Sequence, residues 1–224
     1  RLAAETGAAV SGTATGEGAG SGRLAAADSA LERLTLDGTL RARGVAVDGH
    51  ALGDVFVTGR TSRDKLRLEL ESNFLRAKIA GQGEVVLRDR FAAQGRVEFT
   101  NLGVPAALEL GGRGDLPVEG SADGFLTVAG EVGRAETFSA TGSVSRIELA
   151  WSQGAVSRTL RGSGPVNWRL AKQRLTLEPC GLEGEGSDLR GSGSVELGGA
   201  GALNLALEGK LDLGALAAFW RQKL

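Results

Sequence analysis

The chain has 224 residues, of which 42% are hydrophobic, and its 26 basic and 27 acidic side chains give a net charge of −1. This length is enough for one large domain or two small ones. The balance of charge, with no basic stripe and no aromatic residues among clustered Lys and Arg, excludes the electrostatic pattern of a nucleic-acid binder. Glycine supplies 36 residues and aromatic residues only 4%, so the apolar mass is Leu, Val and Ala. That composition favours a thin β layer over a thick globular core.

The first part of the chain is rich in small residues. Residues 1–32 have the composition of a flexible linker, but Val10-Ser11-Gly12 returns 108 residues later as Val118-Glu119-Gly120. The later copy continues into the apolar run 125–128, which predicts a strand. We therefore predict a Gly-rich strand in the first segment as well.

Short alternating runs follow, and each places apolar side chains at every second position. This period of two puts them on one face of a strand, and Gly, Asp or Asn between the runs marks short turns, so neighbouring strands are predicted to pair antiparallel. The predicted apolar stripe consists of Leu34, Leu36, Leu40, Val55, Val57, Leu66, Leu68, Leu70, Ile79, Val85, Leu87, Val97, Phe99, Val144, Ile147, Leu149, Val166, Trp168, Leu170, Leu175, Leu177, Val195, Leu197, Leu203, Leu205 and Leu207. Helix is predicted at the C-terminal end, over 214–224, and a short helical or irregular crossover over 103–108.

Four segments of the chain recur at nearly one spacing, between 109 and 111 residues. The matched segments are 54–57 with 165–168, 65–71 with 174–178, 81–87 with 191–197, and 101–103 with 212–214. A repeat of this length predicts a stack of structural units. We place the first unit at 1–112 and the second at 113–224, with one continuous groove and as parts of a longer protein.

The residue types that catalysis and metal binding require are scarce. His50 is the only histidine and Cys180 the only cysteine, which excludes a structural zinc site and a Ser/His/Asp set. We expect His50 to be a solvated turn residue and Cys180 a small buried side chain at a strand end. The glycine pairs around 184–193 lack the Lys-Ser/Thr of a phosphate loop, and Arg113-Gly114-Asp115 is a tripeptide that arises by chance. No enzyme activity, cofactor or metal is predicted.

The order of these segments resembles the TamB and AsmA-like family of bacterial envelope proteins. In that family a Leu-x-Leu strand is followed by a Gly-rich strand, another Leu-x-Leu strand and a crossover of the form Leu-Asp-Leu-(small)-x-Leu. Here these are residues 175–177, 189–195, 203–209 and 211–216. The resemblance covers nearly the whole chain. It implies an all-β fold in which elongated, curved antiparallel sheet repeats form a U-shaped apolar groove, the β-taco or repeating β-groove, and the residues of the apolar stripe are then expected to line the lipid groove.

The resemblance also implies a function. Members of the family lie in the periplasm of Gram-negative bacteria, are anchored in the inner membrane, and carry phospholipid acyl chains along the groove between the two membranes. TamB-like members work with TamA, an outer-membrane barrel, in the assembly of outer-membrane proteins. Phospholipid and a TamA-type barrel are therefore the expected partners. An alternative stays open, because an apolar face must be buried against something: a structural β-repeat spacer or adhesin stalk with a closed, dry core.

Overall fold

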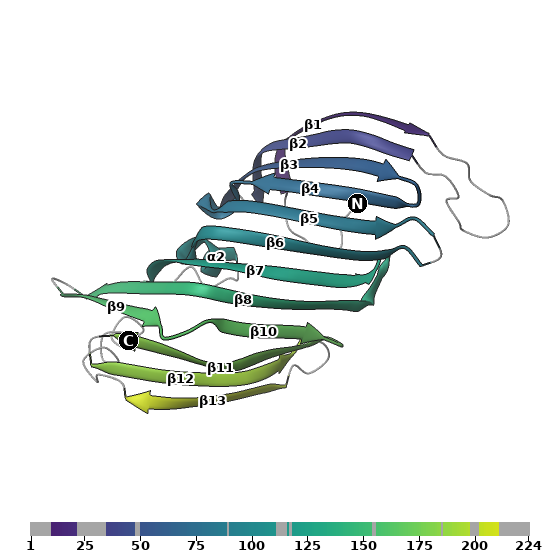
Figure 1. Ribbon diagram of the computed structural model, residues 1–224. Coiled ribbons are helices and arrows are strands. Elements are labelled where there is room, and N and C mark those ends of the chain that lie inside the picture. The colour runs from purple at the N-terminus through teal and green to yellow at the C-terminus, as the bar shows by residue number, and fades with distance from the viewer. Residues whose placement is uncertain are drawn as a thin grey trace. The chain divides into compact units, whose positions relative to one another are not determined.

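The fold is almost entirely antiparallel β-sheet, as the computed structural model shows (Figure 1). The structure describes residues 10–21, 35–47, 50–88, 90–110, 116, 118–153, 156–184, 186–197 and 202–210. In this part of the chain the sheet has thirteen strands: twelve follow the order β1 to β8 and then β10 to β13, and β9 pairs with β8 and β11. The all-β prediction is confirmed. Helix α2 (Val104–Leu110) occupies the predicted crossover, whereas the helix predicted over 214–224 lies outside the described residues.

The chain divides into two compact units, and strands β6, β7 and β8 each contribute residues to both. Unit 1 comprises residues 1–101 and 126–139, and unit 2 comprises 102–125 and 140–224. The first six strands are β1 (Val10–Ser21), β2 (Thr35–Val47), β3 (His50–Ser62), β4 (Lys65–Ser72), β5 (Lys78–Val86) and β6 (Ala92–Gly103). The others are β7 (Glu119–Glu131), β8 (Arg134–Gln153), β9 (Val156–Gly162), β10 (Val166–Ala171), β11 (Arg174–Gly184), β12 (Ser187–Glu196) and β13 (Leu203–Lys210). The predicted division into two repeats, 1–112 and 113–224, is based on the duplicated sequence and stays a prediction.

Antiparallel pairing in unit 1 separates apolar from charged side chains. Leu70 of β4 lies opposite Val57 of β3 and Gly81 of β5. Directly opposed residues point to the same face of a sheet, so the registers define an apolar face that carries Leu40, Ala42, Val55, Val57, Leu66, Leu68, Leu70, Ile79, Val85, Val97 and Phe99. The opposite, polar face carries Arg41, Arg60, Lys65, Arg67, Glu69, Glu71, Lys78, Glu84, Arg96 and Glu98.

Unit 2 separates its side chains in the same way. Leu175 of β11 lies opposite Leu170 of β10 and Val195 of β12, and Val195 lies opposite Leu203 of β13. The apolar face of unit 2 is therefore formed by Val166, Trp168, Leu170, Leu175, Leu177, Leu182, Leu189, Val195, Leu203, Leu205 and Leu207. Its polar face carries Arg169, Arg174, Thr176, Glu183, Asp188, Arg190, Ser194, Glu196 and Glu208.

The pairing register recurs between the units with an offset of 109 or 110 residues. The corresponding pairs are Leu66–Val85 with Leu175–Val195, and Leu68–Gly83 with Leu177–Gly193. The offset between β4 and β11 changes from 109 to 110 because β11 has one extra residue at an irregularity between Leu177 and Cys180. Because Gly59 lies opposite Leu68 and Trp168 lies opposite Leu177, Trp168 occupies the position of Gly59. Matching 54–57 with 165–168 in the sequence had aligned Trp168 with Val57, two residues away on the same face.

Side chains rather than a second layer hold one end of strands β2 to β4. Asp54 accepts a hydrogen bond from the backbone N–H of Gly44 at 2.8 Å, and Asn73 Oδ1 accepts one from the N–H of Asp54 at 2.6 Å. Gly53, with φ of 124°, lets the chain approach Asn73 closely, since a Cβ on Gly53 would lie 2.5 Å from Asn73 Oδ1. This conformation is open to glycine and strained for other residues.

Replacing Gly53 by Ala is expected to lower the free energy of unfolding by about 1–3 kcal/mol, because the new Cβ clashes and the backbone stays in a disfavoured region. Chemical denaturation measures the loss. Gly16→Ala is the matched control, since a Cβ there meets Thr39 O at 3.5 Å and Leu40 Cδ1 at 3.6 Å, which are ordinary contacts. Equal losses in both variants would contradict this account of the Gly53 position.

Candidate functional site

The apolar face of unit 1 contains a row of glycines that crosses the strands. Gly18, Gly38, Gly59, Gly83 and Gly95 lie opposite one another in register from β1 to β6, and Leu68 of β4 stands between Gly59 and Gly83. We call these six residues the glycine row. Five of its six positions have no side chain. Leu68 Cδ2 covers Gly59, at 3.4 Å from the position of a Cβ there, so the row is open at Gly83 and Gly95, and we call this open part the trough.

Larger side chains flank the glycine row on both sides. One neighbouring row consists of Leu40, Val57, Leu70, Gly81 and Val97, and the other of Thr61, Leu66, Val85 and Ala93. Residues two apart in a strand are about 6.6 Å apart, so the backbones of the flanking rows are about 13 Å apart. The walls of the trough are therefore aliphatic, apart from Thr61.

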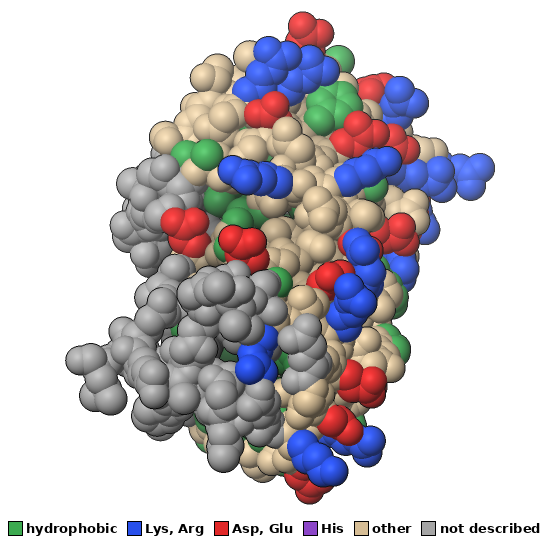
Figure 2. All heavy atoms as spheres, turned by 90° about the vertical axis from the view of Figure 1, so that its left-hand side faces the viewer, with side chains coloured by type: hydrophobic (Ala, Val, Ile, Leu, Met, Phe, Trp, Pro, Cys, Tyr) green, Lys and Arg blue, Asp and Glu red, His purple; other side chains and the backbone are tan. Residues whose placement is uncertain are grey.

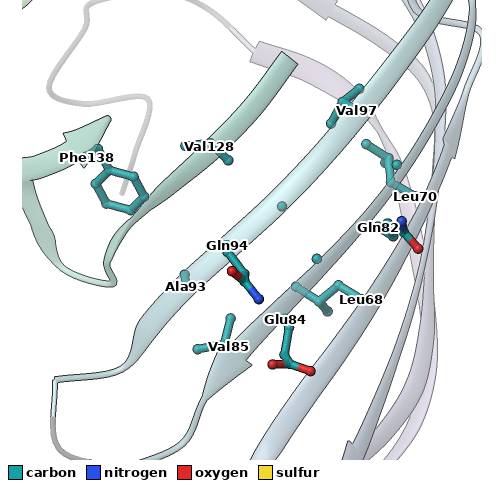
Figure 3. Close-up of a pocket in the computed structure, with 13 residues that line it drawn as sticks. Leu68, Leu70, Gln82, Glu84, Val85, Ala93, Gln94, Val97, Val128 and Phe138 are labelled. Atoms are coloured by element: carbon teal, nitrogen blue, oxygen red, sulfur yellow. The ribbon is translucent and has the colours of Figure 1, made fainter. Parts of the chain in front are cut away.

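A cavity of about 240 Å³ lies over the glycine row at Gly83 and Gly95. Leu68, Leu70, Val85 and Val97 line it from β4, β5 and β6, and Val128 and Phe138 line it from β7 and β8, as Figure 3 shows. Val128 Cγ1 lies 3.8 Å from the position of a Cβ on Gly95. With about 30 Å³ for one water molecule, this cavity has room for a short stretch of hydrocarbon rather than a whole lipid.

The polar face of unit 1 is also hollowed at these two glycines. A depression of about 350 Å³ there is lined by Arg67, Glu69, Gln82, Glu84, Gln94, Arg96 and Thr127. Glu84 Oε1 lies 2.7 Å from Lys65 Nζ and Glu84 Oε2 lies 3.8 Å from Arg67 Nε. Because such exposed pairs neutralise each other and are screened by solvent, this depression has no strong field of one sign.

Charges of both signs are interspersed elsewhere too. Figure 2 shows acidic and basic side chains side by side on the described surface that it draws. Arg134 donates a hydrogen bond to Glu131 at 2.9 Å, which lowers the pKa of the Glu131 carboxyl and raises the pKa of Arg134. Donation to Asp123 likewise raises the pKa of Arg146. These shifts keep the pairs ionised, as solvated ion pairs are at neutral pH.

In unit 2, the row that corresponds to the glycine row is filled. It runs through Gly142, Trp168, Leu177, Gly193 and Leu205. The indole of Trp168 covers Gly142, because the ring occupies the space that a Cβ on that glycine would need. Leu205 lies over Gly193 in the same way, with its Cδ1 at 3.3 Å from the Cβ position. Unit 2 thus carries side chains where unit 1 has a trough.

The predicted apolar stripe follows the apolar faces of the two units wherever its residues lie in paired, described strands. Leu34 and the side chain of Leu36 lie outside the described residues. Leu40 is 49% exposed, and Leu197, Leu203, Leu205 and Leu207 are 61–70% exposed. Leu87 follows the end of β5 and is buried. Whether these side chains line a lipid groove stays a prediction.

Several structural residues were not predicted from the sequence. Val128, Phe138 and the glycines of the trough were not placed in the stripe, although the alternation of residues 125–128 pointed to Val128. The buried hydrophobic side chains of the described residues are Leu52, Leu75, Ala77, Leu87, Ala122 and Leu160, and only Leu87 was predicted. His50 is the first residue of β3 and pairs with Val47, so its placement in a turn was wrong.

Cys180 lies inside β11, past the irregularity, rather than at a strand end. Its side chain is partly buried, and Sγ donates to Gly191 O at 3.4 Å. The tripeptide 113–115 lies outside the described residues. Within the described ranges, no three or more His, Cys, Asp or Glu side chains are grouped to hold a metal ion, and none of the helices has the length and hydrophobicity that spanning a membrane requires.

Comparison with known proteins gives no relative from which a role can be transferred. No protein-family model matches the chain, and no curated protein or solved structure matches it either. A function for this chain therefore has to be argued from the geometry of its two apolar faces.

Gly83→Val is expected to fill the trough and to weaken the binding of an apolar naphthylamine dye to unit 1. Displacing one or two methylenes of contact, at about 0.8 kcal/mol each, reduces affinity about 4- to 15-fold. A fluorescence titration measures this change. Glu69→Val places the same side chain on the polar face, outside the cavity, and is expected to leave dye affinity within about twofold of the original. Equal effects of the two variants would show that the dye does not occupy the trough.

Proposed function

We propose that the chain is a non-enzymatic, lipid-conducting segment that carries phospholipid acyl chains along its apolar faces. The observation that carries this proposal is the apolar face of unit 1, where the registers bring aliphatic residues together across β2 to β6 around the trough. In the part of the chain that the structure describes, no large side chain is fully buried. An apolar face that its own fold leaves only partly buried is stabilised by an apolar ligand.

The chemistry of the trough suits an acyl chain. Its walls are Leu and Val side chains, which contribute burial of about 0.8 kcal/mol per CH₂ without directional bonds. Contacts of this kind differ little from one position of the hydrocarbon to the next, so a bound chain slides with a low barrier. The polar face meets solvent, and a phospholipid head group remains in water while its tails are covered. No covalent step is required.

The setting of this activity is proposed from the sequence pattern. The order of Leu-x-Leu and Gly-rich strands resembles that of TamB and AsmA-like proteins, so we place the chain in the periplasm of a Gram-negative bacterium, as part of a parent protein anchored in the inner membrane. Transport between the inner and outer membranes, and a contribution to outer-membrane protein assembly with a TamA-type barrel, follow from the same resemblance.

A second candidate function is a structural β-repeat spacer or stalk. One observation favours it: in unit 2, Trp168 and Leu205 cover the glycines of the corresponding row. Side chains of the chain itself therefore occupy the positions of this row that a hydrocarbon chain would occupy in unit 1. The two candidates differ in whether the apolar faces are covered by lipid or by protein.

Leu68→Arg is expected to lower phospholipid binding about tenfold or more, because it puts a charge in the middle of the trough, where burial is costly. Native mass spectrometry after incubation with phosphatidylethanolamine and phosphatidylglycerol vesicles measures the bound fraction. Glu69→Arg, one residue along β4 on the polar face, introduces the same side chain and is expected to retain lipid. A wild-type chain that binds no lipid would favour the spacer. Equal lipid binding by both variants would remove the trough as the binding site.

A further inference from the structure

The two end strands of the described sheet differ in side-chain size on the apolar side. On β13, Leu203, Leu205 and Leu207 are 61–70% exposed. On β1, the positions that share the apolar face are all small: Ala14, Gly16, Gly18 and Gly20. Within the described residues, the partner of β13 is β12 and that of β1 is β2. One strand therefore offers protruding leucines and the other offers room for them.

The chain already contains a junction between the two strands that correspond to β13 and β1 in the repeat, with the side-chain sizes reversed, since Gly95 of β6 faces Val128 of β7. β13 corresponds to β6, because Val195–Leu203 and Gly193–Leu205 repeat the pairs Val85–Ala93 and Gly83–Gly95. β1 corresponds to β7, since Val10-Ser11-Gly12 returns as Val118-Glu119-Gly120. Gly12 and Gly120 share an unusual backbone conformation, with φ of 145° and 142°. In the strand order, β6 and β7 are neighbours.

The residues of β6 and β7 that belong to unit 1 give the register of this junction. A Cβ on Gly95 would lie 3.8 Å from Val128 Cγ1 on the apolar face, and Arg96 and Thr127 both line the depression on the polar face. Going from Gly95 to Arg96 along β6 corresponds to going from Val128 back to Thr127 along β7, so the two strands run antiparallel. Transferred to β13 and β1, this register sets Leu205 against Gly20, Ala206 against Ala19 and Leu207 against Gly18.

We propose that the β13 edge of one chain binds the β1 edge of a second copy of this chain, in the register of β6 and β7. Backbone hydrogen bonds of an added strand supply the attraction, and the leucines of β13 lie over the glycines of β1. Leu205 and Leu207 lie over Gly193 and Gly191 of β12 in the same manner. Because the two edges differ, the contact is head-to-tail and leaves a free edge of each kind on the growing assembly. This association does not depend on lipid.

The register also contains a repulsive pair, which makes it testable. Glu208 of β13 is set against Glu17 of β1, and like charges directly opposite each other weaken strand pairing. Glu208→Lys is therefore expected to strengthen association about two- to tenfold, and the double variant Glu17→Lys with Glu208→Lys is expected to return it to the original value. Sedimentation velocity over a range of concentrations measures both. No change in Glu208→Lys, or the same gain in the double variant, would overturn this register.

Disulfide trapping tests the contact directly. In a Cys180→Ser background, a chain with Ala206→Cys is mixed with a chain with Ala19→Cys and oxidised, and a covalent dimer is expected. Ala206→Cys mixed with Thr13→Cys is the control, because Thr13 lies on the same face of β1 but six residues away, about 20 Å along the strand. A disulfide requires Cα atoms within about 7 Å. Equal cross-linking of both mixtures, or none in the first, would overturn the proposal.

The variant Leu205→Lys with Leu207→Lys checks the role of the leucines. Both side chains are more than 60% exposed, so the fold is expected to tolerate the change, which circular dichroism verifies. Loss of association is expected, because charged side chains on an edge strand block the addition of another strand. Association at the original strength would overturn the proposed fit of leucines over glycines.

Discussion

The structure depends on one constraint: each unit is built on a sheet with an apolar face, and the described chain offers little of its own to cover that face. Pairing in register brings Leu66, Leu68 and Leu70 together with Val85 and Val97, and alternation sends the charged residues to the other side. In a closed sandwich, a second layer would bury such side chains to near zero exposure. Here they are partly buried, and the free energy available from covering the rest of their surface is left for a ligand or another chain.

The two units share one pairing register but carry different side chains on the apolar face. Their registers agree from β3 to β6 and from β10 to β13, yet Gly59 is replaced by Trp168 and Gly95 by Leu205 at corresponding positions. Unit 1 therefore has a trough and unit 2 has side chains in its place. The Trp168 indole is the largest side chain in the row of unit 2, where it covers Gly142.

Much of this arrangement could be predicted from local alternation. A period of two determines on which side of the sheet each side chain lies, once the strands pair antiparallel. The predicted stripe residues from Val55 to Phe99, apart from Leu87, fall on one face for this reason. Cross-strand relations were beyond reach: no single strand reveals that five glycines align, or that an offset of 109 makes Trp168 the counterpart of Gly59. The network around Gly53 and Asn73 was also missed, since it depends on side-chain hydrogen bonds between distant segments. The alternation also does not reveal what covers the apolar faces, because that depends on the surroundings of the chain.

The central claim is that acyl chains cover the apolar face of unit 1, and Val85 and Val86 give the most direct test. They are adjacent in β5, but Val85 lies opposite Leu66 on the apolar face and Val86 lies opposite Lys65 on the polar face. Methyl-labelled protein is titrated with a phospholipid that carries a nitroxide on its acyl chain, and the methyl signals are followed by NMR. The account predicts strong broadening of the Val85 methyls and little change for Val86. Equal broadening of the two residues, or none at Val85, would contradict it.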